Sequence, residues 1–477
     1  MPRPSSRPPK PQATRASVAL DTHIPRDLVD KYDQPGPRYT SYPTVPEWSA
    51  DFGPADVASA LAANAQDRAG VPLSLYIHVP FCAKLCYYCG CNIHLTRDDA
   101  LVERYIAAVD REVGRIADMV DTGRPVVQIH WGGGTPTHLN PDQLTRLYGT
   151  LVRRFRVAAE AEISLEVHPN VTGSEQMETL ASLGFNRVSM GVQDFDPAVQ
   201  KAVNRLQPYE VTRDLVEIAR RLNFQSVNLD LMYGLPLQTL EGFRDTLGKV
   251  GAIRPDRVAL FNYAHLPAMF PHQKAFRELP DRELKLDLFE LAIDYFVGQG
   301  YQYIGMDHFA LPENELSRAR QDRTLRRNFM GYTTCADSDL LSFGMSAISD
   351  LDGAFYQNER KLPGYFEAVE AGNLPTIRGM TLSAEDKLRR DVIYTLACHG
   401  HLDKRKVETR HGVSFDQHFA AELDDLRGME RDRLVRLDPE VIRVLPRGQV
   451  LIRNVCMPFD AYLRARPAAA RRFSRTV

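Results

Sequence analysis

The sequence predicts an α/β fold: a partial, open parallel β/α barrel of about six units, followed by a smaller, mostly helical C-terminal domain with a short β wing. Short β-branched runs alternate with longer helical patterns, and one unit spans roughly 35 to 40 residues, the spacing of a β/α barrel. The pattern changes near residue 384, which predicts the second domain. Six units are too few to close an eight-unit barrel, so we expect the barrel to stay open.

Each expected strand of this barrel is followed by an expected helix. The strands are expected at 73–79, 126–131, 162–167, 187–193, 226–234 and 257–265. The helices are expected near 97–120, 141–154, 174–183, 196–203, 209–222, 239–250 and 281–299. Parallel strands joined by right-handed crossovers bring all their carboxyl ends to one edge, where the chemistry of such barrels takes place.

The composition divides the chain into four expected parts. Residues 1–20 hold five prolines and four basic residues without an acid, which favours a disordered tail over a targeting sequence. Residues 21–70 are expected to cover the barrel opening, and residues 71–383 to form the catalytic barrel. Residues 384–477 are expected to form the C-terminal domain, with helices near 384–398 and 416–431 and a two-stranded wing at 433–437 and 441–445. Its basic end is interpreted as a solvated tail or, alternatively, as a segment docked through Phe473.

Charge and hydropathy argue against several classes of function. Lys plus Arg is 59 and Asp plus Glu is 61, a net charge of -2, so nothing global indicates nucleic acid or an anionic membrane. No basic helix accompanies the wing, and no apolar run approaches the length of a membrane span. Seven cysteines are too few, and odd in number, for a disulfide scaffold, so we expect a cytoplasmic protein.

Four of these cysteines, Cys82, Cys86, Cys89 and Cys91, lie in PFCAKLCYYCGCN. A disulfide does not fit a reducing compartment, and a structural zinc site usually draws on a second, separate pair of ligands. An iron–sulfur cluster fits best: C-x3-C-x2-C supplies three thiolates and leaves one iron of a cubane open for a ligand. Cys91, one residue beyond Cys89, has no assigned role. The isolated Cys335, Cys398 and Cys456 are interpreted as structural thiols.

Polar residues mark the ends of the next strands. The second strand runs into WGGGTPT (131–137), where glycines let the backbone approach a ligand closely. Glu166 and Gln193 end the third and fourth strands, and Asp230 lies in the fifth. Corresponding positions in neighbouring strands favour one shared site. This set suits a ligand with an ammonium group, ribose hydroxyls and adenine edges.

These motifs resemble a known family. CAKLCYYC is similar to the cluster motif of radical S-adenosylmethionine (SAM) enzymes, and GGGTP to the element that holds the SAM amino group. More specific segments resemble the oxygen-independent coproporphyrinogen III oxidase family over about residues 28 to 477. These segments are PGPRYTSYPT (35–44), CGCN (89–92), SMGVQDF (189–195), FNYAHLP (261–267) and GMDHFA (305–310).

The resemblance implies one [4Fe–4S] cluster and two SAM molecules in one cavity. It assigns Cys82, Cys86 and Cys89 to the cluster, whose open iron the first SAM chelates. The positions that match the lining of the first SAM are Tyr76, Gly133, Glu166 and Ile348. Those that match the lining of the second SAM are Tyr88, Gly134, Thr135, Gln193, Arg205, Asp230 and Ala264.

The resemblance also implies the reaction. A radical made from SAM removes a β-hydrogen from a propionate of coproporphyrinogen III, and loss of carbon dioxide and one electron leaves a vinyl group. Two rounds, on rings A and B, give protoporphyrinogen IX without dioxygen. We expect a monomer that uses an external electron donor and acceptor. A haem-binding chaperone of the same superfamily is the alternative, but such relatives lack the PGPRYTSYPT segment and a cysteine at the position of Cys91. The remaining rival is a zinc-stapled, non-catalytic interaction protein.

Four substrate propionates require local positive charge. Arg38 lies in the PGPRYTSYPT segment, where two prolines preset the turn, and we expect it to bind a propionate. Five arginines crowd SRARQDRTLRRNF, and a solvated surface is the simpler interpretation of that run. They are Arg318, Arg320, Arg323, Arg326 and Arg327.

Overall fold

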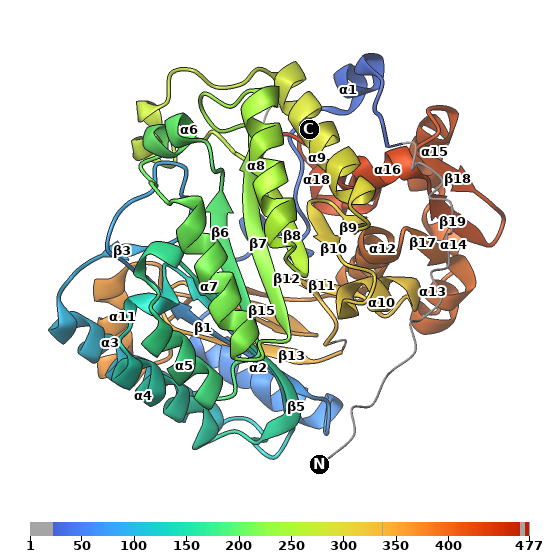
Figure 1. The fold of residues 1–477 in the computed structure, drawn as a ribbon. Helices are drawn as coiled ribbons and strands as arrows, with labels where there is room; N and C mark the ends of the chain where they lie inside the picture. Colours follow the sequence, from blue (N-terminus) through green and yellow to red (C-terminus); the bar gives the residue numbers. More distant parts are fainter. Residues whose placement is uncertain (1–21, 336, 468–472, 477) are drawn as a thin grey trace, which may run out of the picture.

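The computed structural model describes residues 22–335, 337–467 and 473–476, and it places them around one twelve-stranded sheet (Figure 1). Seven neighbouring strands of this sheet run parallel. In spatial order they are β13 (Asp339–Phe343), β1 (Leu73–Val79), β4 (Val126–Gly133), β5 (Val157–Val167), β6 (Arg187–Gln193), β7 (Ser226–Tyr233) and β8 (Arg257–Asn262). The six strands from β1 to β8 follow chain order, which confirms the predicted partial barrel.

Helices cover the outer face of these strands (Figure 1). They are α3 (Asp99–Ala117), α4 (Pro141–Val152), α5 (Ser174–Ser182), α6 (Pro197–Ala202), α7 (Tyr209–Arg221), α8 (Leu240–Ile253) and α9 (Arg282–Gly298). Side-chain caps begin several of them: Asn140 and Gln143 form a capping box on α4, and Asp98 accepts a hydrogen bond from the Ala100 amide on α3. These helices therefore begin where the sequence supplies an oxygen for the free amides.

The two faces of the parallel sheet differ in polarity. In β6, Val188, Met190 and Val192 are buried against the helices, while Arg187 and Ser189 are half-buried on the inner face. The other strands repeat this alternation, because side chains along a strand point to opposite faces. Parallel strands are usually apolar on both faces. The polar inner face therefore lines a hollow rather than a packed barrel core.

Antiparallel strands extend the sheet at both edges, which the sequence patterns did not predict. One edge carries β14 (Ile348–Leu351), β15 (Ala354–Asn358) and β16 (Thr376–Thr381), and the other carries β10 (His308–Ala310) and β9 (Gln302–Gly305). Two short pairs lie outside the sheet: β2 (Phe81–Cys82) with β3 (His94–Leu95), and β11 (Arg326–Asn328) with β12 (Gly331–Thr333). The helices of these connections are α10 (Glu315–Gln321) and α11 (Leu362–Glu370).

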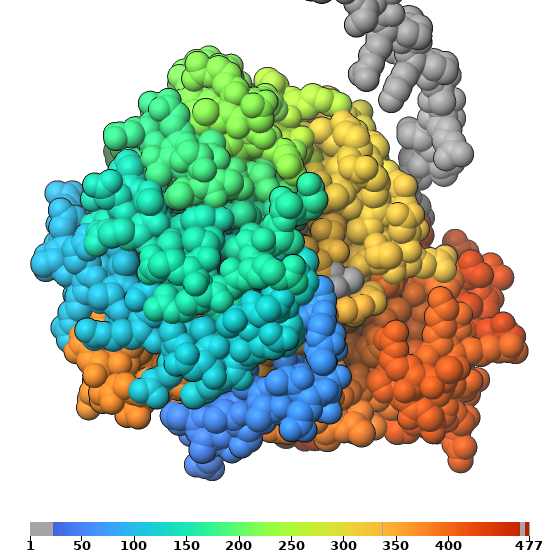
Figure 2. Space-filling model, turned by 90° about the horizontal axis from the view of Figure 1, so that it is seen from below, coloured from blue at the N-terminus to red at the C-terminus, as the bar shows by residue number. Residues whose placement is uncertain are grey.

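The C-terminal region forms one side of the molecule (Figures 1 and 2). It contains α12 (Ala384–His399), α13 (Lys404–His411), α14 (Phe415–His418), α15 (Ala420–Arg431), α16 (Pro446–Val450), α17 (Ile452–Cys456) and α18 (Ala461–Ala465). The prediction of a two-stranded wing is wrong, because the structure has three strands there. β19 (Val441–Val444) pairs with β18 (Val435–Leu437) on one side and with β17 (His401–Asp403) on the other. The single helix expected at 416–431 is broken at Phe419 into α14 and α15.

The N-terminal segment packs on this C-terminal region. It contains α1 (Arg26–Tyr32) and α2 (Pro54–Asp67), and residues 24–42 share an apolar cluster with α12, α15 and α17. Arg453 donates hydrogen bonds to the carbonyl oxygens of Pro37 (3.1 Å) and Ser474 (3.1 Å), and so joins the two chain ends. Phe473 packs against the same cluster, as the docked alternative predicted.

Two further expectations concern the ends and the division of the chain. The tail expected at 1–20 lies outside the described residues, and the four-part division stays a prediction. In the described part of the chain, no helix combines the length and apolar character needed to cross a membrane.

Candidate active site

The cysteine loop follows β1 and is held by two other segments. The Tyr87 amide donates to the Val203 carbonyl (3.0 Å), and the Asn204 side chain donates to the Leu85 carbonyl (2.8 Å). A ring nitrogen of His272 lies 2.8 Å from the Cys89 carbonyl oxygen. Cys82, Cys86 and Cys89, the three predicted cluster ligands, line one cavity of about 470 Å³. The loop is therefore placed by backbone contacts, which leave its thiols free to face that cavity.

Glycines at the end of β4 form the adjoining wall. Gly133 has φ +112°, and a Cβ there would lie 2.4 Å from the His78 ring. A Cβ on Gly134 would lie 2.6 Å from the Pro80 carbonyl oxygen. Side chains are excluded at both positions, so the backbone is exposed toward the cavity. The adjacent Thr135 hydroxyl lies 3.4 Å from the Cys82 sulfur.

Glu166 lies across from these glycines and is held as a carboxylate. It accepts a hydrogen bond from the Gly133 amide (3.2 Å), and its Oε1 lies 3.9 Å from His130 Nε2. Enclosure by protein raises the pKa of Glu166, but His130, the Gly133 amide and His78 outweigh this and hold the pKa below its ordinary value. His130 also contacts Ser164 (2.8 Å) and stacks on Tyr76, with ring centroids 5.9 Å apart.

Asp230 faces the same cavity with the opposite pKa shift. Burial and the charge of Glu166 raise the pKa of Asp230 to about 7, against the lowering effect of hydrogen bonds from Ser189 (3.1 Å) and Asn228 (2.7 Å). Glu166 and Asp230 do not bond to each other, and the resemblance assigns them to different SAM molecules. The site therefore offers one ionised carboxylate and one that is half-protonated near neutral pH.

Several polar atoms beside these carboxylates have no partner within the described residues. They include Oε1 of Gln193 and Nε of Arg205, which line the same cavity, whereas the unpartnered Oδ1 of Asn262 belongs to a residue that lines the cavity of about 480 Å³. Arg205 uses its other nitrogens to contact the Gly191 carbonyl (2.6 Å) and the Cys86 sulfur (3.8 Å). Gln193 has φ +68°, a backbone conformation that is rare for a side-chain-bearing residue. Buried polar groups are normally paired, so these atoms indicate a ligand with hydrogen-bonding groups at this position.

Most of the predicted site residues come together. Cys82, Cys86, Tyr88, Cys89, Gly133, Gly134, Thr135, Glu166, Gln193, Arg205 and Asp230 all line the 470 Å³ cavity. Tyr76 reaches it indirectly, through His130. Ala264 instead lines a neighbouring cavity of about 480 Å³, and Ile348 packs in a separate apolar cluster with Trp48. Arg38 forms an ion pair with Asp307, and its guanidinium lies 5.8 Å from the Phe261 ring centroid.

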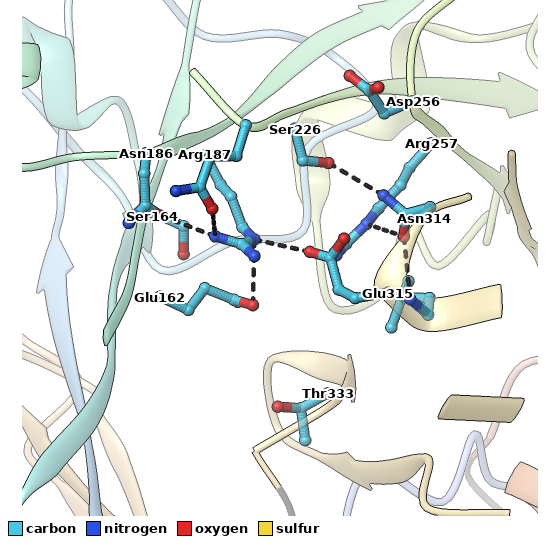
Figure 3. Close-up of polar contacts among 12 residues, drawn as sticks. Glu162, Ser164, Asn186, Arg187, Ser226, Asp256, Arg257, Asn314, Glu315 and Thr333 are labelled. Atoms are coloured by element: carbon cyan, nitrogen blue, oxygen red, sulfur yellow. Dashed lines mark hydrogen bonds and ion pairs between the residues drawn. The ribbon is translucent and has the colours of Figure 1, made fainter. Parts of the chain in front are cut away.

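A charged network at the amino-terminal end of the hollow was not predicted (Figure 3). Arg187 lies between Glu162 (3.2 Å) and Glu315 (2.8 Å), and Glu315 also pairs with Arg257 (2.5 Å). Asn314 accepts from Arg257 (3.0 Å). We call Glu162, Arg187, Arg257 and Glu315 the base network. Its two guanidinium groups balance its two carboxylates.

The signal for the residues of the inner face was present in the sequence. In EISLEV, RVSMGVQ and SVNLDLM, polar or small residues occupy every second position, which indicates a polar inner face. From these three strands, the sequence analysis selected only Glu166, Gln193 and Asp230 as candidate site residues. The base network itself joins residues that lie up to 128 positions apart, which no local pattern reveals.

The donor set fits the cofactors that the resemblance implies. Three thiols in one loop suit a [4Fe–4S] cluster with one open iron. Exposed backbone at Gly133 and Gly134, two carboxylates and the unpartnered atoms of Gln193 and Arg205 suit a ligand that carries ammonium, carboxylate, hydroxyl and adenine groups.

Comparison with known proteins agrees with this site. Residues 76–250 match the Radical SAM superfamily, and residues 382–451 match the HemN C-terminal domain. The oxygen-independent coproporphyrinogen III oxidase of Escherichia coli (strain K12) is 45% identical, with 94% of this chain and 98% of that protein aligned. The protein of the same name from Synechocystis sp. is 43% identical, over 94% and 97% of the two chains.

A solved structure extends the agreement to three dimensions. The coproporphyrinogen III oxidase of Escherichia coli, described as a radical SAM enzyme, superimposes with a TM-score of 0.88 at 43% identity, over 92% of this chain and 99% of that one. This similarity includes the mostly parallel sheet and the helical C-terminal region. The chain therefore belongs to the oxygen-independent coproporphyrinogen III oxidase family of the radical SAM superfamily.

Proposed function

We propose that this chain catalyses the oxygen-independent oxidative decarboxylation of coproporphyrinogen III in haem and porphyrin biosynthesis. The ring A and B propionates become vinyl groups, and the product is protoporphyrinogen IX. The observation that carries the proposal is one cavity that brings together Cys82, Cys86 and Cys89 with Glu166 and Asp230, in a chain of this family. The haem-binding chaperone is not favoured by any feature of this cavity.

The same cavity would hold the cofactors. Cys82, Cys86 and Cys89 would ligate the [4Fe–4S] cluster. Tyr76, Gly133, Glu166 and Ile348 would line the first SAM, and Tyr88, Gly134, Thr135, Gln193, Arg205, Asp230 and Ala264 the second. When bound, the cluster and SAM supply one electron and a carbon-centred radical that removes the β-hydrogen of a propionate.

The chain's own residues prepare the site. Glu166 stays ionised near neutral pH because His130 and the Gly133 amide lower its pKa, so it suits an ammonium group. Arg205 is fixed by the Gly191 carbonyl and keeps its Nε free toward the cavity. The buried outer face and its helices keep water away from one side of this site.

Arg38 is proposed to bind a substrate propionate. Its present partner is Asp307, and burial together with the charges of Arg453 and Arg327 lowers the pKa of Arg38 to about 9. A second carboxylate beside this crowded cation would be stabilised by the surplus positive charge. We further propose that the protein acts as a cytoplasmic monomer, without nucleic acid or membrane. It would receive its electron from an external donor and pass one to an external acceptor.

One anaerobic assay tests the proposed function. Reconstituted protein, SAM, a low-potential reductant and an electron acceptor are mixed with coproporphyrinogen III, and carbon dioxide and vinyl porphyrins are measured. Two carbon dioxide molecules per protoporphyrinogen IX are expected. Stable haem binding without carbon dioxide release would contradict the proposal and favour the chaperone. A colourless protein with one zinc and no affinity for SAM would favour the interaction protein.

A further inference from the structure

Arg327 in β11 is a buried cation without a counter-ion. The residue is 5% exposed, and its Nε and Nη1 have no hydrogen-bond partner among the described residues. No carboxylate within the described part of the chain forms an ion pair with it, whereas Arg187 and Arg257 both pair with Glu315. An unpaired buried charge is strongly unfavourable, so the fold holds Arg327 ready for an anionic group that is not part of the described chain.

An aromatic wall runs from Arg327 to Arg38. The Arg327 guanidinium lies 4.8 Å from the ring centroid of Tyr332, its partner in the β11–β12 hairpin. The Tyr332 ring meets His308 edge to face (5.3 Å), and His308 meets Phe261 in the same way (6.3 Å). Arg38 lies over the other end of this row, on Phe261. The wall formed by Phe261, His308 and Tyr332 therefore has a guanidinium at each end.

This aromatic wall adjoins the proposed site of catalysis. Phe261, His308 and Tyr332 line a cavity of about 170 Å³ together with Glu166 and Asp230. Phe261 also lines the cavity of the cysteine loop. An apolar ring with carboxylates at its edge matches such a wall: the ring packs on the aromatic side chains, and the carboxylates reach the guanidinium groups.

Arg327 itself opens toward a larger space. It lines a cavity of about 640 Å³ that reaches α12, and Thr333 lines both this cavity and the one with the aromatic wall. Three carboxylates of the larger cavity are already paired: Asp350 and Asp352 with Arg390, and Asp339 with Arg68. A substrate carboxylate that extends past Thr333 would meet Arg327, a buried cation that lacks an ion-pair partner among the described residues.

We propose that Arg327 binds a propionate of the tetrapyrrole whose ring lies on the aromatic wall of Phe261, His308 and Tyr332. The proposal rests on the proposed function and selects one residue from the arginine run at 318–327. Arg318 and Arg323 are exposed, and Arg320 donates to the carbonyl of Tyr303 and to Gln449. Arg326 is only half-buried, so water can solvate its charge, whereas Arg327 is buried. Arg327 is also the stronger anchor of the two ends, because Arg38 must first leave Asp307.

The test uses the full chain with its cofactors reconstituted. Coproporphyrin III, the air-stable oxidised relative of the substrate with the same four propionates, is titrated against wild type, Arg327→Met, Arg327→Lys and Arg323→Met. Arg323→Met is the matched control from the same segment, at an exposed position. Unfolding midpoints of the cofactor-free proteins are measured in parallel.

Loss of one charge-assisted carboxylate contact is expected to weaken binding by about tenfold or more in Arg327→Met. Arg327→Lys should recover part of that lost affinity. Arg323→Met should bind coproporphyrin III with wild-type affinity. The unfolding midpoint of Arg327→Met should equal or exceed that of wild type, because an apolar side chain replaces an unpaired charge. Wild-type affinity in Arg327→Met, or its marked destabilisation, overturns this inference alone. Failure of the wild type to bind coproporphyrin III and to release carbon dioxide contradicts the proposed function instead.

Discussion

The two ends of the hollow differ in how completely their polar groups are paired. At the amino-terminal ends of the strands, the base network matches two arginines with two glutamates, and its side chains bond mainly to one another. At the carboxyl ends, Gln193, Arg205 and Asn262 each keep an unpartnered atom among the described residues. The polar groups of the base network are thus paired at one end of the sheet, whereas several polar groups at the other end lack a hydrogen-bond partner.

This difference separates stability from binding within one cavity. A satisfied network supports the fold, because any lost partner leaves a buried charge uncompensated. An unsatisfied group costs stability until a ligand supplies its partner. We therefore expect substitutions in the base network to act on unfolding, and substitutions at the carboxyl ends to act on cofactors and turnover.

The largest effect is expected at the cysteine loop. Cys86→Ser should abolish both cluster iron and turnover, because three thiolates are the minimum that holds the cubane. Iron content and vinyl product are measured after anaerobic reconstitution. Cys91→Ser is the control from the same loop and should keep its iron. If Cys86→Ser kept its full iron content and turnover, the assignment of the cluster to this loop would be wrong.

A substitution that removes one arginine of the base network should destabilise the folded protein. Arg187→Met leaves Glu162 without a cation and is expected to lower the free energy of unfolding by about 3 kcal/mol. Urea unfolding of the cofactor-free protein measures this free energy. Arg213→Met is the control, since Arg213 pairs with Asp214 on the surface and should show no measurable change. Equal effects in the two variants would mean that the network does not support the fold.

The raised pKa of Asp230 predicts that the stability of the folded protein depends on pH. Its pKa is raised to about 7 in the folded protein, so the folded state keeps a proton that the unfolded chain releases at lower pH. Wild-type stability should therefore fall as pH rises from about 4 to about 7 and then level off. Asp230→Asn removes this fall, so the cofactor-free variant should unfold at a higher temperature than wild type at pH 8.

The same comparison has a second measurement. The gap between the two unfolding midpoints should shrink toward pH 5, and Asp230→Asn should bind the second SAM more weakly while retaining its cluster iron. A constant gap across this pH range would show that Asp230 does not carry the titration. Loss of iron in the variant would mark Asp230 as a residue of the fold.

The smallest effect is expected at Arg38. Arg38→Ala should weaken substrate binding only severalfold, because the wild-type guanidinium must exchange Asp307 for a propionate. The variant should raise the substrate concentration needed for vinyl product more than it slows 5′-deoxyadenosine formation. The two products are measured in the same reactions. Unchanged substrate dependence would leave Arg38 as an anchor of the N-terminal segment.

The parallel core of the fold was predictable because its strands alternate strongly. Leu73–Val79 and Arg187–Gln193 were predicted to the residue, since a β-branched run ends there at a turn or a polar residue. The strands from Ile348 to Thr381 were not predicted. They are short, and Asp352 and Gly353 interrupt them, so their pairing is decided by the edge of a sheet already formed.

The candidate site was predictable where residues share a short motif. The cysteine loop and the glycines after β4 are such motifs, and Glu166, Gln193 and Asp230 follow from their places in strands. Arg327 lies in a run of five arginines that the sequence does not distinguish, because they differ in burial and in hydrogen-bond partners. Its unpaired state depends on the β11–β12 hairpin and on α12, so it becomes visible only in three dimensions.

The contacts between the chain ends set an order of folding during synthesis. Arg453 bonds to carbonyls at both ends, and the Thr476 amide donates to Gln34 (2.9 Å). A ribosome adds about 5 to 20 residues per second, so residues 33–37 emerge roughly 20 to 90 seconds before their partners at 474–476. The segment that carries Arg38 therefore gains these contacts only after the barrel has been synthesised.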